Sequence, residues 1–178
     1  MNKSLVVAEQ AGAGLRYRLL ETIRLFAAER LAEVGGQETT AVAAGHCAHF
    51  LAVAEAAAAY LAGPDLGRWL ARLEADQANL RRAAEHAAGG PDGTAVVLRL
   101  GVALRRYWEA RSREQEAFAL LAPVLRRPDA RADPGLFAAA LCAAAQVGCF
   151  VDVPAARHFA EQAVQDARRL GDPGSGCV

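Results

Sequence analysis

The segments AVVLRLGVALRRYWEA (residues 95–110), QEAFALLAPVLR (115–126), LFAAALCAAAQVG (136–148) and VPAARHFAEQAVQDARRL (153–170) decide the fold. Each segment carries apolar or alanine residues at helical spacing, and short polar or proline-containing breaks separate the segments. One helix pair cannot bury its apolar face alone. We therefore expect two consecutive helical hairpins that stack on each other, which predicts a helical interaction scaffold.

The composition of the 178-residue chain favours a helical body. Hydrophobic residues make up 53% of the chain, but aromatic residues make up only 6%. Alanine is the best helix former, so this balance predicts a core built by close approach of helices. The formal net charge is zero. The chain therefore lacks the excess of basic residues that is typical of a dedicated nucleic-acid-binding domain.

The cysteines and the apolar segments indicate in which cellular compartment the protein resides. The four cysteines form no CxxC pair, and Cys142 and Cys149 lie two helical turns apart, where we interpret them as small core residues. This usage predicts a reduced, cytoplasmic setting. Residues 136–151 are uncharged but fall short of the ~20 strongly apolar residues of a membrane span, so we expect a buried repeat helix there and no membrane contact.

The front of the chain predicts a β-hairpin followed by helices. Residues 4–9 and 15–20 are predicted strands, the second with alternating apolar and basic residues, and glycines between them favour a turn. A helix is predicted over residues 22–34, with an apolar stripe on one face and a glycine C-cap at its end. A long helix over residues 40–61 follows.

Two aspartates are predicted to begin the next helices. Asp65 and Asp76 are suitable N-cap residues, and the second helix extends over residues 77–88. The proline and glycine cluster after residue 88 then separates this front part from the paired helices.

Particular segments resemble a known family. RYRLLETIR (16–24) with the following LFAAERL (25–31), WLARLE (69–74) and DQANLRRAA (76–84) are similar to the bacterial signal-transduction ATPases of the STAND class, which include LuxR-type and SARP-type regulators. The resemblance covers nearly the whole chain. It implies a mainly α fold with a partial winged helix over residues 1–36, a linking helical bundle over 37–90, and tetratricopeptide-like repeats over 91–178.

Within the repeats, the resemblance assigns core and turn positions. Ser112 and Val151 stand where each repeat would have its turn glycine, a departure that puts strict repeat geometry in doubt but not the antiparallel pairing. The expected core positions are Trp108, Ala117, Leu121 and Val124 in the first repeat and Ala156, Ala160 and Ala163 in the second.

The first candidate binding surface is the inner groove of the repeat stack. With Trp108 in the core, this groove would be lined by Arg99, Val102, Arg106 and Glu109. Such a groove binds a protein or an extended peptide through shape and charge. The alternative is that these residues form a solvated helix face.

The second candidate surface is the basic hairpin. Lys3, Arg16 and Arg18 are positioned to contact phosphate, which gives the alternative function of a DNA-binding module. The resemblance instead implies that this winged helix is a contact element between domains.

No pattern in the chain indicates catalysis. Lys3 lacks the preceding glycine turn of a P-loop, and no nucleophile–base signature is present. His46 and His49 lie one helical turn apart without the further ligands that zinc requires. We therefore expect a non-enzymatic protein without catalytic, cofactor-binding or metal-binding residues.

The resemblance implies a function and a set of partners. The chain would be the non-catalytic interaction and sensing part of a STAND-type transcription-regulating ATPase, truncated at both ends, and the missing ATPase domain would be one partner. A truncated stack is also expected to expose the alanine-rich face of its last helix pair and to self-associate.

Overall fold

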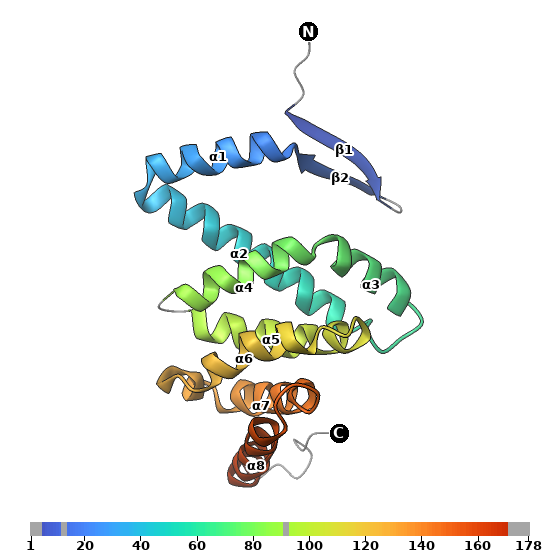
Figure 1. Cartoon of the computed structure of the whole chain (residues 1–178), viewed down its shortest axis with the longest axis vertical. Helices are drawn as coiled ribbons and strands as arrows, with labels where there is room; N and C mark the ends of the chain where they lie inside the picture. Colours follow the sequence, from blue (N-terminus) through green and yellow to red (C-terminus); the bar gives the residue numbers. More distant parts are fainter. Residues whose placement is uncertain (1–4, 12–13, 91–92, 171–178) are drawn as a thin grey trace. The chain divides into compact units, whose positions relative to one another are not determined.

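The computed structural model describes residues 5–11, 14–90 and 93–170. The chain divides into two compact units, Met1–Gly45 and His46–Val178. The described part is mainly helical with a two-stranded hairpin near its start, as Figure 1 shows, so the predicted fold class is confirmed.

The first unit contains the hairpin and a helix. Strands β1 (Val6–Ala11) and β2 (Gly14–Leu19) pair antiparallel, two residues later for β1 than predicted. Helix α1 (Glu21–Val34) ends at Gly35, which has a φ of 60° and donates its N–H to the carbonyl of Leu31. The predicted glycine C-cap is therefore confirmed.

The apolar stripe of α1 is not buried. Phe26 is 56% exposed, and no side chain described between residues 17 and 45 is buried. The guanidinium of Arg30 lies 5.1 Å from the centre of the Phe26 ring. The helical period correctly shows which residues of α1 share a face, but it does not show what covers that face.

Helix α2 (Gly36–Ala58) leads from the first unit into the second and begins four residues before the predicted start. The second unit continues with α3 (Leu66–Ala75), α4 (Gln77–Gly89), α5 (Gly93–Ala110), α6 (Glu114–Leu125), the 3-10 helix η1 (Pro128–Ala132), α7 (Pro134–Gly148) and α8 (Val153–Leu170). Helix α5 packs on α4, α6 and α7, while α7 packs on α6 and α8 (Figure 1). This order of neighbours is the one predicted for two stacked helix pairs.

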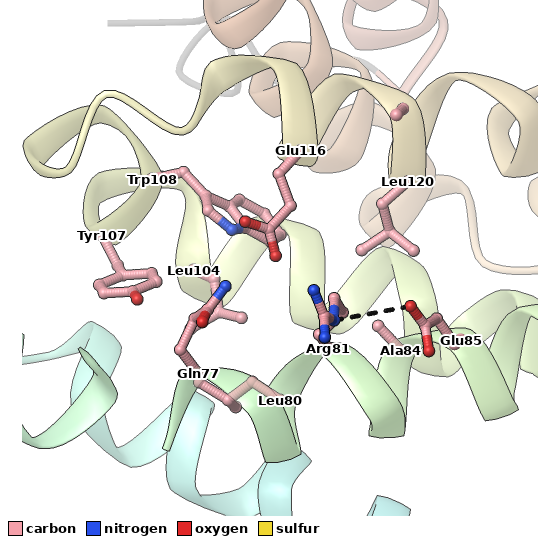
Figure 2. Close-up of a pocket in the computed structure, with 11 residues that line it drawn as sticks. Gln77, Leu80, Arg81, Ala84, Glu85, Leu104, Tyr107, Trp108, Glu116 and Leu120 are labelled. Atoms are coloured by element: carbon pink, nitrogen blue, oxygen red, sulfur yellow. Dashed lines mark ion pairs between the residues drawn. The ribbon is translucent and has the colours of Figure 1, made fainter. Parts of the chain in front are cut away.

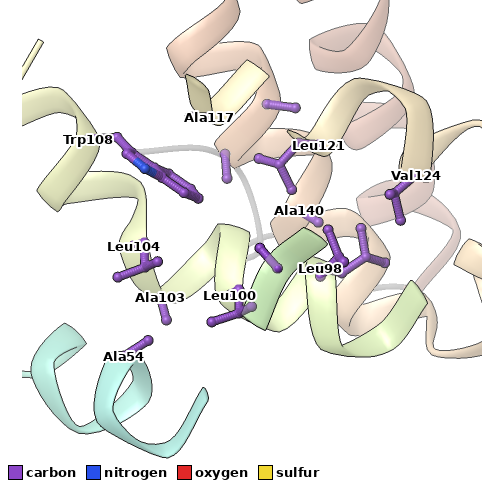
Figure 3. Packing of buried hydrophobic residues seen from close by; sticks show 14 of the residues in the cluster. Ala54, Leu98, Leu100, Ala103, Leu104, Trp108, Ala117, Leu121, Val124 and Ala140 are labelled. Atoms are coloured by element: carbon purple, nitrogen blue, oxygen red, sulfur yellow. The ribbon is translucent and has the colours of Figure 1, made fainter. Parts of the chain in front are cut away.

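The core of the second unit is built from alanines and aliphatic side chains between closely spaced helices (Figure 3). Trp108 and Ala117 are buried as expected, at 4% and 0% exposure. A Cβ on Gly101 would lie 2.3 Å from Cδ2 of Leu121, so α5 approaches α6 at a distance that only glycine permits. Close helix approach is therefore the physical basis of the core, as the composition predicted.

The two helix pairs turn in different ways. Ser112 has a φ of 51°, the left-handed conformation that a repeat glycine would adopt. At the second turn, the N–H of Val151 donates to the carbonyl of Gly148 at 3.0 Å. Ser112 therefore adopts the left-handed conformation of the turn although it is not a glycine.

The interpretation of Cys142 and Cys149 as core residues is wrong, whereas the core positions predicted in α8 are confirmed. Cys149 is exposed at the end of α7, where its thiol donates to the carbonyl of Ala145, and Cys142 is half-buried and is engaged in a disulfide. In α8, Ala156 and Ala163 are buried and Ala160 is half-buried against the core, as expected for the core positions of the second repeat.

Two helices, α7 and α2, are apolar enough to raise the question of a membrane span. Helix α7 is apolar and most of its residues are buried, as predicted for a repeat helix. By length and composition alone α2 is long enough to cross a membrane, although 33% of its apolar window is buried inside the protein. A core helix passes the same test, so this is weak support for a span.

Candidate functional site

The predicted groove residues share one face of α5 but differ in their surroundings. Arg99 forms a bidentate pair with Glu55 of α2, with Nε 2.7 Å from Oε1 and a second nitrogen 2.8 Å from Oε2. Val102 is 36% exposed, and Arg106 and Glu109 are exposed as well. All four residues of the predicted surface are therefore exposed, and Arg99 differs from the others in that it also pairs with Glu55 of α2.

A pocket of about 300 Å³ lies on the opposite side of α5, between α4, α5 and α6 (Figure 2). Helical periodicity places Leu104, Tyr107 and Trp108 on this side, away from Val102 and Arg106. The pocket is lined by Gln77, Leu80, Arg81, Ala84 and Glu85 of α4, Leu104, Tyr107 and Trp108 of α5, and Glu116, Ala119 and Leu120 of α6.

The pocket is apolar inside and carries ionised groups in its wall. Arg81 lies 3.7 Å from Glu85, one helical turn away on α4, and both side chains are largely exposed. Glu116 lies 3.4 Å from the guanidinium of Arg113. Each charge in the wall therefore has a partner of opposite sign.

A polar cluster adjoins the pocket at the end of α5. The hydroxyl of Tyr107 donates to Oε2 of Glu74 at 3.0 Å, and Arg113 donates to Oε1 of the same carboxylate at 2.6 Å. Burial and the hydrogen bond to Glu74 raise the pKa of Tyr107 to about 12. Partial desolvation opposes ionisation of Glu74, but the bonds from Tyr107 and Arg113 hold the pKa of this carboxyl below its ordinary value. The cluster ties α3 to α5 and to the turn after α5.

The histidine pair does not gain further metal ligands. The ring of His46 contacts that of Phe50 at a tilt of 49°, with ring centres 4.7 Å apart, and His49 meets the same ring edge-on. Burial, together with nearby positive charge, lowers the pKa of His46. No group of three potential ligands occurs in the described part of the chain. These rings therefore have packing roles in the structure.

The basic hairpin is described only in part. Lys3 lies outside the described residues, and of Arg16 the structure describes the backbone, which pairs with Glu9. Arg18 is exposed. The next arginine along the chain, Arg24, is already bound by Glu21, with a nitrogen 2.8 Å from the carboxylate.

Comparison with known proteins adds a relationship to this geometry. Over 186 aligned residues, 97% of the chain is 32% identical to proteins of Mycobacterium bovis and of Mycobacterium tuberculosis that carry the name "Putative HTH-type transcriptional regulator". The chain is similar to HTH-type transcription regulators. It spans only 20% of the length of these mycobacterial regulators. No family model matches the chain, and no solved structure matches it.

The sequence did not predict the pocket that the structure shows. Trp108 and Leu121 were both recognised as core positions, but the gap beside them depends on how far α4 stands from α6, and periodicity does not give that distance. A signal was present on α4, where Gln77, Arg81 and Glu85 follow one another at helical spacing beside Leu80 and Ala84. That pattern marks a polar rim next to an apolar floor.

Proposed function

We propose that the chain is a non-catalytic protein-interaction and sensing module of a bacterial transcription regulator of the STAND class, with tetratricopeptide-like helix pairs. The observation that carries this is the similarity to HTH-type regulators, which extends over 97% of the chain. The packing of α5 on α6 and α7, and of α7 on α8, supports a repeat-like stack. The regulatory relationship also supports the predicted cytoplasmic location.

The partner surface is the exposed face of α5, where Val102, Arg106 and Glu109 lie. These side chains project from a helix whose other faces are packed, so they are held in a fixed spacing. The expected occupant is a protein or peptide segment, such as the ATPase domain of the parent protein. Arg99 contributes by fixing α5 through Glu55 instead of by direct contact.

The proposal is tested in the organism by comparing transcripts from three strains. One lacks this gene segment, one carries Val102→Asp with Arg106→Glu, and one carries the control Gln165→Glu on the exposed side of α8. We expect the double variant to reproduce the transcript changes of the deletion, and the control to match the parent. A deletion without transcript changes would refute the regulatory role, and a silent double variant beside an active deletion would refute the α5 surface.

A DNA-binding module is the second candidate, favoured by the HTH-type relatives and the β1–β2 hairpin. A gel shift with duplex DNA at low and high salt separates the two functions. If the hairpin binds phosphate, Arg16→Ala and Arg18→Ala each reduce the slope of log K against log salt by about 0.9. If the module only binds protein, we expect no salt-sensitive shift at any salt concentration.

Self-association is a further partner expectation, now supported by different residues. The turn between α7 and α8 exposes Phe150 at 79% and Val153 at 58%. Light scattering of the purified chain tests this, with Phe150→Ser as the variant expected to shift a dimer towards monomer.

A further inference from the structure

We propose that the pocket between α4, α5 and α6 binds a small, uncharged, largely apolar molecule that carries a hydrogen-bond-accepting oxygen. The pocket lies on the side of α5 opposite the proposed partner surface. This small-molecule site therefore goes beyond the proposed function, and either one is able to fail without the other.

The volume and the apolar lining of the pocket determine the size and the hydrophobic character of the ligand. A volume of about 300 Å³ is at the lower end of the range for small-molecule sites. It suits a compact one- or two-ring molecule. Leu80, Leu104 and Leu120 provide aliphatic walls, and the indole of Trp108 provides a flat one (Figure 2). Burying an apolar body against these walls supplies most of the binding free energy.

Two polar groups in the lining select an acceptor on the ligand. The indole N–H of Trp108 makes no hydrogen bond to any part of the chain that the structure describes, and because no buried side-chain nitrogen there lacks a partner, this N–H is accessible to solvent and to a ligand. The carboxamide of Gln77 is half-buried in the same lining and likewise makes no hydrogen bond there. A carbonyl oxygen on the ligand would accept hydrogen bonds from these N–H groups.

The charges of the wall exclude an ionised ligand. Arg81 is already compensated by Glu85, and Glu116 by Arg113. A charged ligand would lose its hydration and either compete with these pairs or remain unpaired over an apolar floor. A neutral ligand avoids this penalty.

The neutral fluorophore Prodan is the probe, because it has a naphthalene body and a ketone oxygen. The protein is the chain of residues 1–178 with Trp69→Phe, which leaves Trp108 as the single tryptophan. We expect saturable one-to-one binding, with a blue shift of the Prodan emission and quenching of Trp108. Absence of saturable binding would overturn the proposal.

Matched variants locate the bound probe. Ala119 is exposed at the pocket rim, and Ala78 is exposed on α4 outside the lining. Ala119→Phe is expected to weaken Prodan binding at least tenfold, and Ala78→Phe to leave it unchanged. Gln77→Phe, at the α4 rim, provides a second blocking variant that keeps Trp108 as the single tryptophan. Circular dichroism and cooperative unfolding confirm that each variant is folded, and equal binding by the blocked and control variants would place the probe elsewhere.

A matched pair of competitors tests the ligand chemistry. 2-Acetylnaphthalene is neutral with a ketone oxygen, and 2-naphthoate has the same ring system with a carboxylate. We expect 2-acetylnaphthalene to displace Prodan at a concentration at least tenfold lower than 2-naphthoate does. Glu116→Gln is expected to narrow this difference, because it removes one negative charge from the wall. Equal or stronger displacement by 2-naphthoate would overturn the neutral-ligand assignment.

Discussion

The phenolic hydroxyl of Tyr107 lies 3.0 Å from Oε2 of Glu74 and donates a hydrogen bond to it. Tyr107 is only 1% exposed, so its hydroxyl reaches this carboxylate from a buried ring. Arg113 occupies the other oxygen of Glu74, and Arg111 lies 3.5 Å from the carboxylate. One acidic residue of α3 therefore organises the end of α5 and the turn that follows.

Tyr107→Phe is expected to lower the free energy of unfolding by about 1 kcal/mol, because one hydrogen bond is lost while the ring packing is kept. Urea denaturation followed by circular dichroism measures this. Tyr60→Phe is the control, since Tyr60 is 45% exposed and stacks on Trp69 without a hydrogen bond from its hydroxyl among the described residues. Equal effects of both substitutions would show that the bond to Glu74 adds no stability.

The same bond predicts a dependence on alkaline pH. The pKa of Tyr107 is raised from 10.0 to about 12 in the folded protein. A raised folded-state pKa gives stability that is fully present below pH 10 and is lost as the pH rises through 12. We expect the difference in unfolding free energy between the parent and Tyr107→Phe to be constant below pH 10 and to shrink from pH 10 to 12. A difference that stays constant throughout this range would contradict the assignment.

The main features of the fold were predictable because the helices are long and strongly periodic. The helix pairs α5–α6 and α7–α8 were located within two residues at each end, and Trp108 and Ala117 were correctly placed in the core. Ser112 was recognised as the turn position that a repeat glycine would occupy, and its φ of 51° agrees. These features depend on local spacing, which a single sequence contains.

The candidate site was less predictable because it depends on distances between helices. The pairing of Arg99 with Glu55 joins α5 to α2 across 44 positions of the chain, and no periodicity relates these two residues. The pocket beside Trp108 likewise results from the separation of α4 and α6. Helical phase correctly placed Arg99 on the exposed face of α5, but it could not give the partner of its guanidinium group.

Gly101 tests the close approach that the core requires. Its missing side chain leaves room for Leu121, which is completely buried and has no alternative space. Gly101→Ala is expected to lower the free energy of unfolding by about 1–3 kcal/mol through overpacking. Gly45→Ala is the matched control, because no atom lies within 4 Å of the position that the new methyl group would occupy and α2 gains about 0.5–1 kcal/mol from alanine in its interior. Stabilisation by both substitutions, measured by thermal unfolding, would contradict the tight α5–α6 contact.

Two aspartates that precede helices differ in whether the side chain caps the helix. Asp65 precedes α3 as predicted, but its side chain makes no capping hydrogen bond to the helix. Asp133 precedes α7 and accepts a hydrogen bond from the backbone N–H of Leu136 at 3.0 Å. Asp133→Ala is therefore expected to lower the free energy of unfolding by about 1 kcal/mol, which is the usual effect of removing an N-cap. Asp65→Ala is expected to change it by no more than about 0.5 kcal/mol, since only the interaction with the helix dipole is lost. Urea denaturation of both variants checks the difference, and a larger loss at Asp65 than at Asp133 would mean that side-chain capping does not stabilise these helix starts.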